Sequence, residues 1–142
     1  NQAIVARGMI SEAELDAIHA ELRAKLIQAN GPQLDAVYYC PHHPNADLAE
    51  FRQVCDCRKP RPGMLTRAAE EWRIDLAQCF LIGDRVTDIL AGKNAGCHTI
   101  LLETGCHTDA PIETSDPIDA RTQADASFAS LTAAADWILE QS

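Results

Sequence analysis

Four residues that can bind a metal lie in two pairs near the middle of the chain: Cys40 with His42, and Cys55 with Cys57. Thiolate sulfur and imidazole nitrogen are ligands that zinc prefers, and two such pairs joined by one loop can surround the ion tetrahedrally. Because protein would fill all four positions, the pattern favours a structural zinc over a catalytic one. The sequence therefore predicts a zinc-binding loop at residues 40–59.

The six cysteines also allow disulfides or free thiols. Cys55 and Cys57 are too close in sequence to bridge each other readily, and nothing in the sequence looks like a secretory leader, so zinc is the favoured interpretation. Three other cysteines have apolar or glycine-containing surroundings, which favours a role as small core residues: Cys79, Cys97 and Cys106. A second, weaker metal candidate joins the pairs Cys97-His98 and Cys106-His107, but its first pair lies in a strand-like run, which favours buried side chains.

Positive charge follows the last of these ligands directly. Arg58, Lys59 and Arg61 lie within four residues of an otherwise acidic chain. Lys59 also lies just before a helix expected to start after Pro62-Gly63, and the N-terminus of a helix favours anions. The sequence therefore predicts that this loop delivers cations to an anion site.

A second motif, Gly83-Asp84 followed by Asp88, places two carboxylates four residues apart at an expected strand-to-helix junction. The glycine permits a tight exit from the strand. Carboxylate oxygens suit Mg2+, which binds few protein carboxylates and keeps water and phosphate oxygens as further ligands. The alternative is that these carboxylates only cap the following helix.

Composition narrows the classes of function. A chain of 142 residues with 46% hydrophobic residues is ordinary for one globular domain, which we expect to span residues 1–142. Its 12 Lys and Arg against 21 Asp and Glu give a net charge of −9, which argues against nucleic acid as a partner. No apolar run approaches the ~20 residues that span a bilayer. We therefore expect a cytoplasmic protein whose ligand is a small anion bound at one place on its surface. We also expect the protein to be a monomer.

The order of the expected elements predicts an α/β fold with a mostly parallel sheet and helices on both faces. Ser11 and Glu14 form a capping-box pattern at the start of a helix that ends before Asn30-Gly31-Pro32. Further helices are expected after Gly63, from Asp84 to Gly96, and at the C-terminal end, and the strands at residues 36–39, 79–83, 98–102 and 126–128. Residues 103–124 are expected to form a long loop over one end of the sheet. Ligands of such sheets bind outside the carboxyl ends of the strands, where we expect both the zinc loop and the acidic motif.

Together the loop lysine, the strand-end motif and the two metal-ligand pairs resemble the haloacid-dehalogenase-like (HAD-like) phosphatases. The similarity is to their small zinc-containing branch, which holds D,D-heptose 1,7-bisphosphate phosphatases and histidinol-phosphate phosphatases. It covers nearly the whole chain, and the runs at residues 40–44, 50–52 and 55–60 look like the heptose-bisphosphate enzymes. Asn1-Gln2 resembles the tail of a T-N-Q motif of that family. The resemblance implies a three-layer Rossmann-like fold and Mg2+ and Zn2+ as cofactors.

The resemblance also implies a role for each matching residue. Lys59 would neutralise the transferring phosphoryl group, Asp84 would ligate Mg2+, and Asp88 would orient that site from the second coordination shell, for instance by pairing with Lys59. The zinc ligands would be Cys40, His42, Cys55 and Cys57, and the substrate contacts Asn1, Arg58, Lys59 and Arg85. The implied reaction is removal of the 7-phosphate of D-glycero-D-manno-heptose 1,7-bisphosphate through an aspartyl-phosphate.

The nucleophile of such enzymes is the first aspartate of an N-terminal strand that ends in D-x-D, and no apolar run with this ending is present. We therefore expect that the chain lacks roughly the first 50 residues of a domain of about 190, including its nucleophile strand, and that it hydrolyses nothing by itself. Two alternatives stay open. One is a histidinol-phosphate phosphatase, and the other is a non-catalytic, zinc-stabilised binding module.

Overall fold

The computed structural model of the chain describes residues 3–103 and 124–141. The described residues form two compact units, one within residues 1–58 and one within residues 59–142. No helix within the described ranges is long and apolar enough to cross a membrane. The expectation of a single domain stays a prediction, and each unit is described by itself.

The first unit contains α1 (Ala3–Ala6), α2 (Glu12–Gln28) and a short 3-10 helix, η1 (Ala49–Phe51). The predicted capping box is confirmed, because the Ser11 hydroxyl accepts a hydrogen bond from the Glu14 amide and the Glu14 carboxylate accepts one from the Ser11 amide. The helix ends as predicted, since Asn30 takes a left-handed conformation (φ 52°) and the Gly31 amide donates to the Leu26 carbonyl at 2.8 Å.

The predicted strand at residues 36–39 is wrong. This segment has no regular secondary structure, although its side chains are mostly half-buried. A β-prone composition becomes a strand only where a neighbouring strand completes the hydrogen-bond ladder. The sheet in the described residues has three strands, and none of them includes this segment.

The second unit contains the sheet, formed by β1 (Phe80–Gly83), β2 (His98–Leu102) and β3 (Ala126–Phe128) in the order β1-β2-β3. Both pairings are parallel, with Ile82 opposite Ile100 and Ile100 opposite Ala126. The helices of this unit are α3 (Gly63–Trp72), α4 (Val86–Ala95) and α6 (Leu131–Glu140), with a 3-10 helix, η2 (Leu76–Gln78), before β1. These strands and α-helices confirm the elements predicted from the sequence for the described part of this unit. The loop expected at residues 103–124 lies almost entirely outside the described residues.

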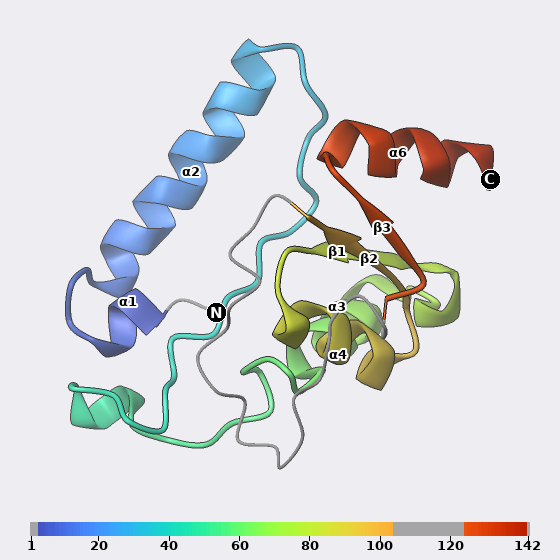
Figure 1. Ribbon diagram of the computed structural model, residues 1–142. Coiled ribbons are helices and arrows are strands. Elements are labelled where there is room, and N and C mark those ends of the chain that lie inside the picture. Colours follow the sequence, from blue (N-terminus) through green and yellow to red (C-terminus); the bar gives the residue numbers. More distant parts are fainter. Residues whose placement is uncertain (1–2, 104–123, 142) are drawn as a thin grey trace. The chain divides into compact units, whose positions relative to one another are not determined.

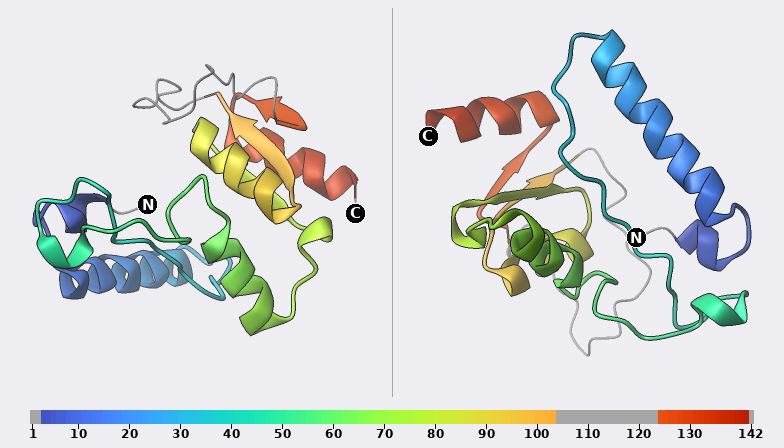
Figure 2. Two further views of the ribbon diagram at one scale, coloured as in Figure 1. Left: turned by 90° about the horizontal axis from the view of Figure 1, so that it is seen from below. Right: turned by 180° about the vertical axis from the view of Figure 1, so that it is seen from behind.

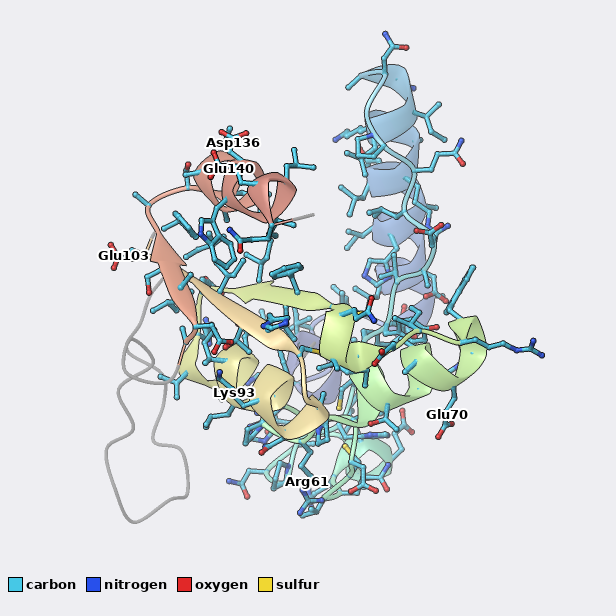
Figure 3. The ribbon with its side chains drawn as sticks, turned by 90° about the vertical axis from the view of Figure 1, so that its right-hand side faces the viewer. Arg61, Glu70, Lys93, Glu103, Asp136 and Glu140 are labelled. Carbon is cyan, nitrogen blue, oxygen red and sulfur yellow. The ribbon has the colours of Figure 1, made fainter. Side chains whose placement is uncertain are left out.

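Helices cover both faces of this sheet, as predicted (Figures 1 and 2). On one face, α4 packs Val86 and Ile89 against Leu101. On the other face, the Trp137 ring of α6 lies 6.0 Å from the Phe80 ring and 5.8 Å from the Phe128 ring, between centroids. Figure 3 shows Asp136 on the side of α6 that points away from the sheet. The second unit is therefore a three-layer, Rossmann-like arrangement of helix, parallel sheet and helix.

A close approach and a polar cluster join α4 to the sheet. A Cβ atom on Gly92 would lie 2.6 Å from Cγ2 of the fully buried Thr99, so the helix can sit this close to β2 only because residue 92 is glycine. Asp125, just before β3, accepts hydrogen bonds through Oδ2 from the Thr99 amide (2.7 Å) and hydroxyl (3.0 Å). Its other oxygen forms an ion pair with Lys93 of α4, which is labelled in Figure 3.

Candidate metal and phosphate sites

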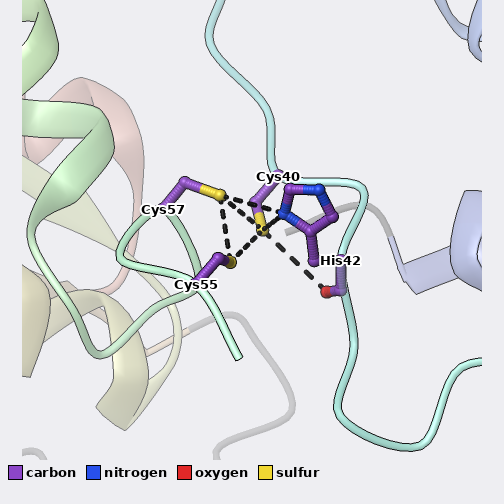
Figure 4. Close-up of side chains that lie close together, drawn as sticks. All are labelled: Cys40, His42, Cys55 and Cys57. Carbon is purple, nitrogen blue, oxygen red and sulfur yellow. Dashed lines mark hydrogen bonds between the residues drawn. The ribbon is translucent and has the colours of Figure 1, made fainter. Parts of the chain in front are cut away.

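Three thiols and one imidazole of the first unit converge at one point (Figure 4). The Cys57 sulfur lies 3.1 Å from the sulfurs of Cys40 and Cys55 and 3.5 Å from His42 Nδ1. The four ligand atoms all lie within 4.8 Å of one another. The structure thus brings together all four residues that the sequence pattern selected.

Local contacts hold the loop that carries these ligands. Its tip is ordered by a hydrogen bond from the His43 amide to the Phe51 carbonyl (3.0 Å) and by the Arg52 guanidinium, whose Nε donates to the Ala46 carbonyl at 2.8 Å. Arg58 donates to the His42 carbonyl at 3.2 Å, so the residue after the last ligand is tied back to the first pair. The regular structure of this loop is one short 3-10 helix, η1. Individual hydrogen bonds such as these therefore hold it in place.

The cluster has the chemistry of a structural zinc site. Three sulfurs and one nitrogen match the tetrahedral Cys3His set, and no open position is left for a substrate. The described cysteines are free, and the sulfur separations of 3.1–3.5 Å exceed the ~2.05 Å of a disulfide bond. Burial, together with neighbouring thiols, raises the pKa of Cys57, and burial raises the pKa of Cys40. Binding of a metal here must therefore displace protons from these thiols.

A second site lies in the other unit, at the carboxyl end of β1. Lys59 begins this unit, and its ammonium group forms an ion pair with the Asp88 carboxylate of α4. The two side chains are 25% and 10% exposed, so the pair lies largely out of water and is screened little by solvent. Asp84 directly follows β1, four residues before Asp88, and is half-buried.

Gly83 makes room for this arrangement. A Cβ atom at this position would lie 2.7 Å from Cγ and 2.8 Å from Oδ2 of Asp88. That oxygen accepts a hydrogen bond from the Arg85 amide at 3.2 Å, so Asp88 both caps α4 and holds Lys59. Asp88 therefore caps α4, which was the alternative weighed from the sequence, and the binding of Mg2+ by Asp84 and Asp88 stays a prediction.

The remaining predicted residues lie in different settings. The side chain of Arg85 is exposed at the start of α4, and Asn1 lies outside the described residues. Cys97 is buried, as expected for a small core residue, and the His98 ring stacks on Phe80 at 5.3 Å between centroids. Cys106 and His107 of the weaker metal candidate lie outside the described residues. Within the described ranges, the one His, Cys, Asp and Glu group that could hold a metal is the Cys40 cluster.

Sequence reasoning missed one contact at the second site. Asn94, in the last turn of α4, donates through Nδ2 to the Pro60 carbonyl at 3.0 Å. The two residues are 34 positions apart, and no local pattern around Asn94 signals the contact. Only the fold, which packs α4 beside α3, brings them together.

Comparison with known proteins agrees with this geometry. The model of the HAD-hydrolase-like family matches residues 56–134, more than half of the chain. The chain therefore belongs to the HAD-hydrolase-like family.

Individual relatives are more specific. The chain is 37% identical over 139 residues to the D-glycero-beta-D-manno-heptose-1,7-bisphosphate 7-phosphatase of Salmonella typhi, covering 98% of the chain and 64% of that protein. It is 42% identical over 106 residues to the protein of the same name from Escherichia coli (strain K12), covering 74% of the chain and 55% of that protein. The chain thus spans less than two thirds of the length of these relatives.

A solved structure shares the fold. The crystal structure of D,D-heptose 1,7-bisphosphate phosphatase from B. bronchiseptica, complexed with magnesium and phosphate, superimposes with a TM-score of 0.77 at 32% sequence identity. The match covers 100% of this chain and 72% of that one. It confirms the HAD-like, Rossmann-type fold predicted from the sequence.

Proposed function

We propose that this chain belongs to a Mg2+-dependent phosphomonoesterase that removes the 7-phosphate of D-glycero-D-manno-heptose 1,7-bisphosphate. One observation carries the proposal: Asp88 holds the Lys59 ammonium, and Asp84 follows directly from the carboxyl end of β1. An ammonium and a strand-end carboxylate at this edge of a parallel sheet suit a phosphate and its cation. The choice of this substrate rests on the names of the relatives.

Each residue then has a defined task. Lys59 neutralises the charge that develops on the transferring phosphoryl group, and Asp88 holds that ammonium in place. Asp84 offers the carboxylate oxygen that Mg2+ prefers; the bound ion would supply further positive charge to the phosphoryl oxygens. Arg58, Arg85 and Asn1 are proposed to contact the substrate. Formation of an aspartyl-phosphate, which the family resemblance implies, stays a prediction.

The Cys40 cluster is proposed to hold a structural Zn2+. Its sulfur and nitrogen ligands fit that ion, and the loop around it has little regular structure that could order it otherwise. Because zinc thiolates require reduced cysteines, the site agrees with the expected cytoplasmic location. A monomeric state and the absence of nucleic-acid partners stay predictions.

The proposal is tested with the complete gene product that contains this chain. Phosphate release from heptose 1,7-bisphosphate and from histidinol phosphate is measured with and without Mg2+. We expect Mg2+-dependent release with a higher kcat/KM for the heptose, and a loss of about 100-fold or more in kcat for Lys59→Ala. The matched control is Lys25→Ala, which removes an exposed lysine paired with Glu21 on α2 and is expected to leave kcat unchanged.

Three results would decide against the proposal. A higher kcat/KM for histidinol phosphate would reassign the substrate. Absence of Mg2+-dependent release from both substrates would favour a non-catalytic binding module. Full activity of Lys59→Ala would show that this ammonium does not act on the phosphoryl group.

A further inference from the structure

Helix α4 contacts residues 59–62, which we call the Lys59 segment, near both of its ends. At the first turn of the helix, Asp88 pairs with the Lys59 ammonium. At the last turn, the Asn94 side-chain amide donates to the carbonyl of Pro60, the next residue along the chain, at 3.0 Å. One contact therefore holds the tip of the lysine side chain, and the other holds the backbone one residue beyond it.

The second contact suits the chemistry of this segment. Pro60 and Pro62 have no amide N–H, so the backbone between Lys59 and α3 offers mainly carbonyl oxygens for attachment to the rest of the unit. A donor is needed on the other side, and the Asn94 amide provides one. The Asn94 amide thus fixes the Lys59 segment to α4 through one of these carbonyl oxygens.

Helix propensity does not explain an asparagine at this position. Asn94 is exposed, so it fills no core space, and asparagine is a poorer helix former than alanine or lysine. Its amide is used on the loop carbonyl instead of on the helix itself. The residue type therefore makes sense as a connection between α4 and the loop.

We propose that Asn94 is a positioning residue for Lys59. The inference rests on the proposed function, in which the Lys59 ammonium must meet a phosphoryl group while Asp88 holds it. A lysine side chain is long and flexible, so the place of its ammonium depends on how firmly its Cα atom is fixed. Misplacement of a reacting group by about 1 Å can cost on the order of 100-fold in rate.

The test compares two substitutions in the complete gene product. Asn94→Asp keeps the shape of the side chain but replaces the donor with an acceptor that faces the Pro60 carbonyl. Asn94→Ala removes the amide without adding a charge, and it improves helix propensity. We therefore expect this variant to fold even where the charge of Asn94→Asp destabilises the protein. For both, we expect kcat for phosphate release to fall about tenfold with KM changed less than twofold, as loss of one hydrogen bond implies.

The matched control is Thr66→Val. The Thr66 hydroxyl also donates to a proline carbonyl of this segment, that of Pro62 at 3.3 Å, but it lies on α3 and beyond Lys59. We expect this variant to keep kcat within twofold of the wild type. An equal loss in Thr66→Val would overturn the proposal, because it would show that any weakening of the loop has the same effect.

A double substitution separates positioning from general stability. If Asn94 acts through Lys59, then Asn94→Asp reduces kcat no further in a Lys59→Ala background. A tenfold loss in that background as well, or wild-type kcat in both Asn94 variants, would overturn the inference.

A second measurement does not depend on activity. In the wild type, an ordered Lys59 side chain should give two distinct NMR signals for its Cε methylene protons, and these should merge in both Asn94 variants but not in Thr66→Val. If the enzyme released no phosphate at all, the proposed function would fail, whereas this signal would still decide whether Asn94 orders Lys59. Two distinct signals that persist in the Asn94 variants would overturn the proposal.

Discussion

Replacement of Asp125 by alanine should be among the most destabilising single changes in the second unit. Its Oδ2 accepts from the amide and the hydroxyl of Thr99 at 2.7 and 3.0 Å, and Thr99 is fully buried. Hydrogen bonds to a charged group contribute about 1.5–3 kcal/mol each, and the buried amide would be left without this acceptor. The ion pair with Lys93 adds less than about 1 kcal/mol, because its side chains are 36% and 38% exposed. We expect a total loss of about 3–5 kcal/mol.

Urea denaturation of three variants checks this reasoning. Asp125→Ala should lower the free energy of unfolding by about 3 kcal/mol or more, Thr99→Val by about 1–2 kcal/mol because the amide contact remains, and Lys93→Ala by under about 1 kcal/mol. An equal effect of Lys93→Ala and Asp125→Ala would refute the reasoning, because it would assign the stability to the exposed ion pair instead of to the buried hydrogen bonds.

The same carboxylate gives a pH dependence. Burial alone would raise the pKa of Asp125, but hydrogen bonds from Lys93 and Thr99 outweigh it and lower that pKa below its ordinary value. A lowered pKa in the folded state contributes stability that is present above the unfolded pKa of about 3.9 and is lost as the pH falls through the folded pKa. The stability difference between wild type and Asp125→Asn should therefore be larger at pH 7 than at pH 3. An unchanged difference would contradict the assignment.

Three further predictions concern the metal cluster, a close packing contact and a helix cap. Cys55→Ser should reduce bound zinc well below one ion per chain, as measured by atomic absorption. It should also destabilise the first unit, since structural zinc sites contribute on the order of 10 kcal/mol. Unchanged zinc content would show that the ligand set is wrong. Gly92→Ala should lower the free energy of unfolding by about 1–3 kcal/mol despite better helix propensity, because the added Cβ atom would lie 2.6 Å from Thr99 Cγ2. A gain in stability would mean that the neighbouring atoms move apart at little cost. Ser11→Ala should cost about 1 kcal/mol through loss of the cap on α2, measured by circular dichroism during urea unfolding, and no change in midpoint would argue against it.

Local signals explain what could be predicted from the sequence. The Ser11 capping box and the glycine at position 96, which takes a left-handed conformation after α4, lie within a few residues of the helix ends that they define. The Cys40 cluster was predicted because ligand type and spacing are themselves local. In each case a short stretch of the sequence contains all the residues that form the cap or bind the metal.

Long-range contacts account for what could not be predicted. The partners Lys93–Asp125 and Asn94–Pro60 lie 32 and 34 residues apart, and neither pair forms a recognisable motif. The strand expected at residues 36–39 failed for the same reason, because strand formation depends on a partner that local composition does not reveal. On α2, the apolar residues Ile18 and Leu22 follow Leu15 at helical spacing, yet they are exposed while Leu15 is buried. Periodicity predicts a helix but not what covers its face.

The position of Trp137 between Phe80 and Phe128 gives the molecule a built-in optical signal. The chain has two tryptophans, and the other one, Trp72 on α3, is already 51% exposed in the folded state, so its emission should change less on unfolding. Undocking of α6 would move the Trp137 indole from aromatic rings into water, so a red shift in emission should accompany it. Intrinsic fluorescence can therefore monitor the outer layer of the second unit without any label.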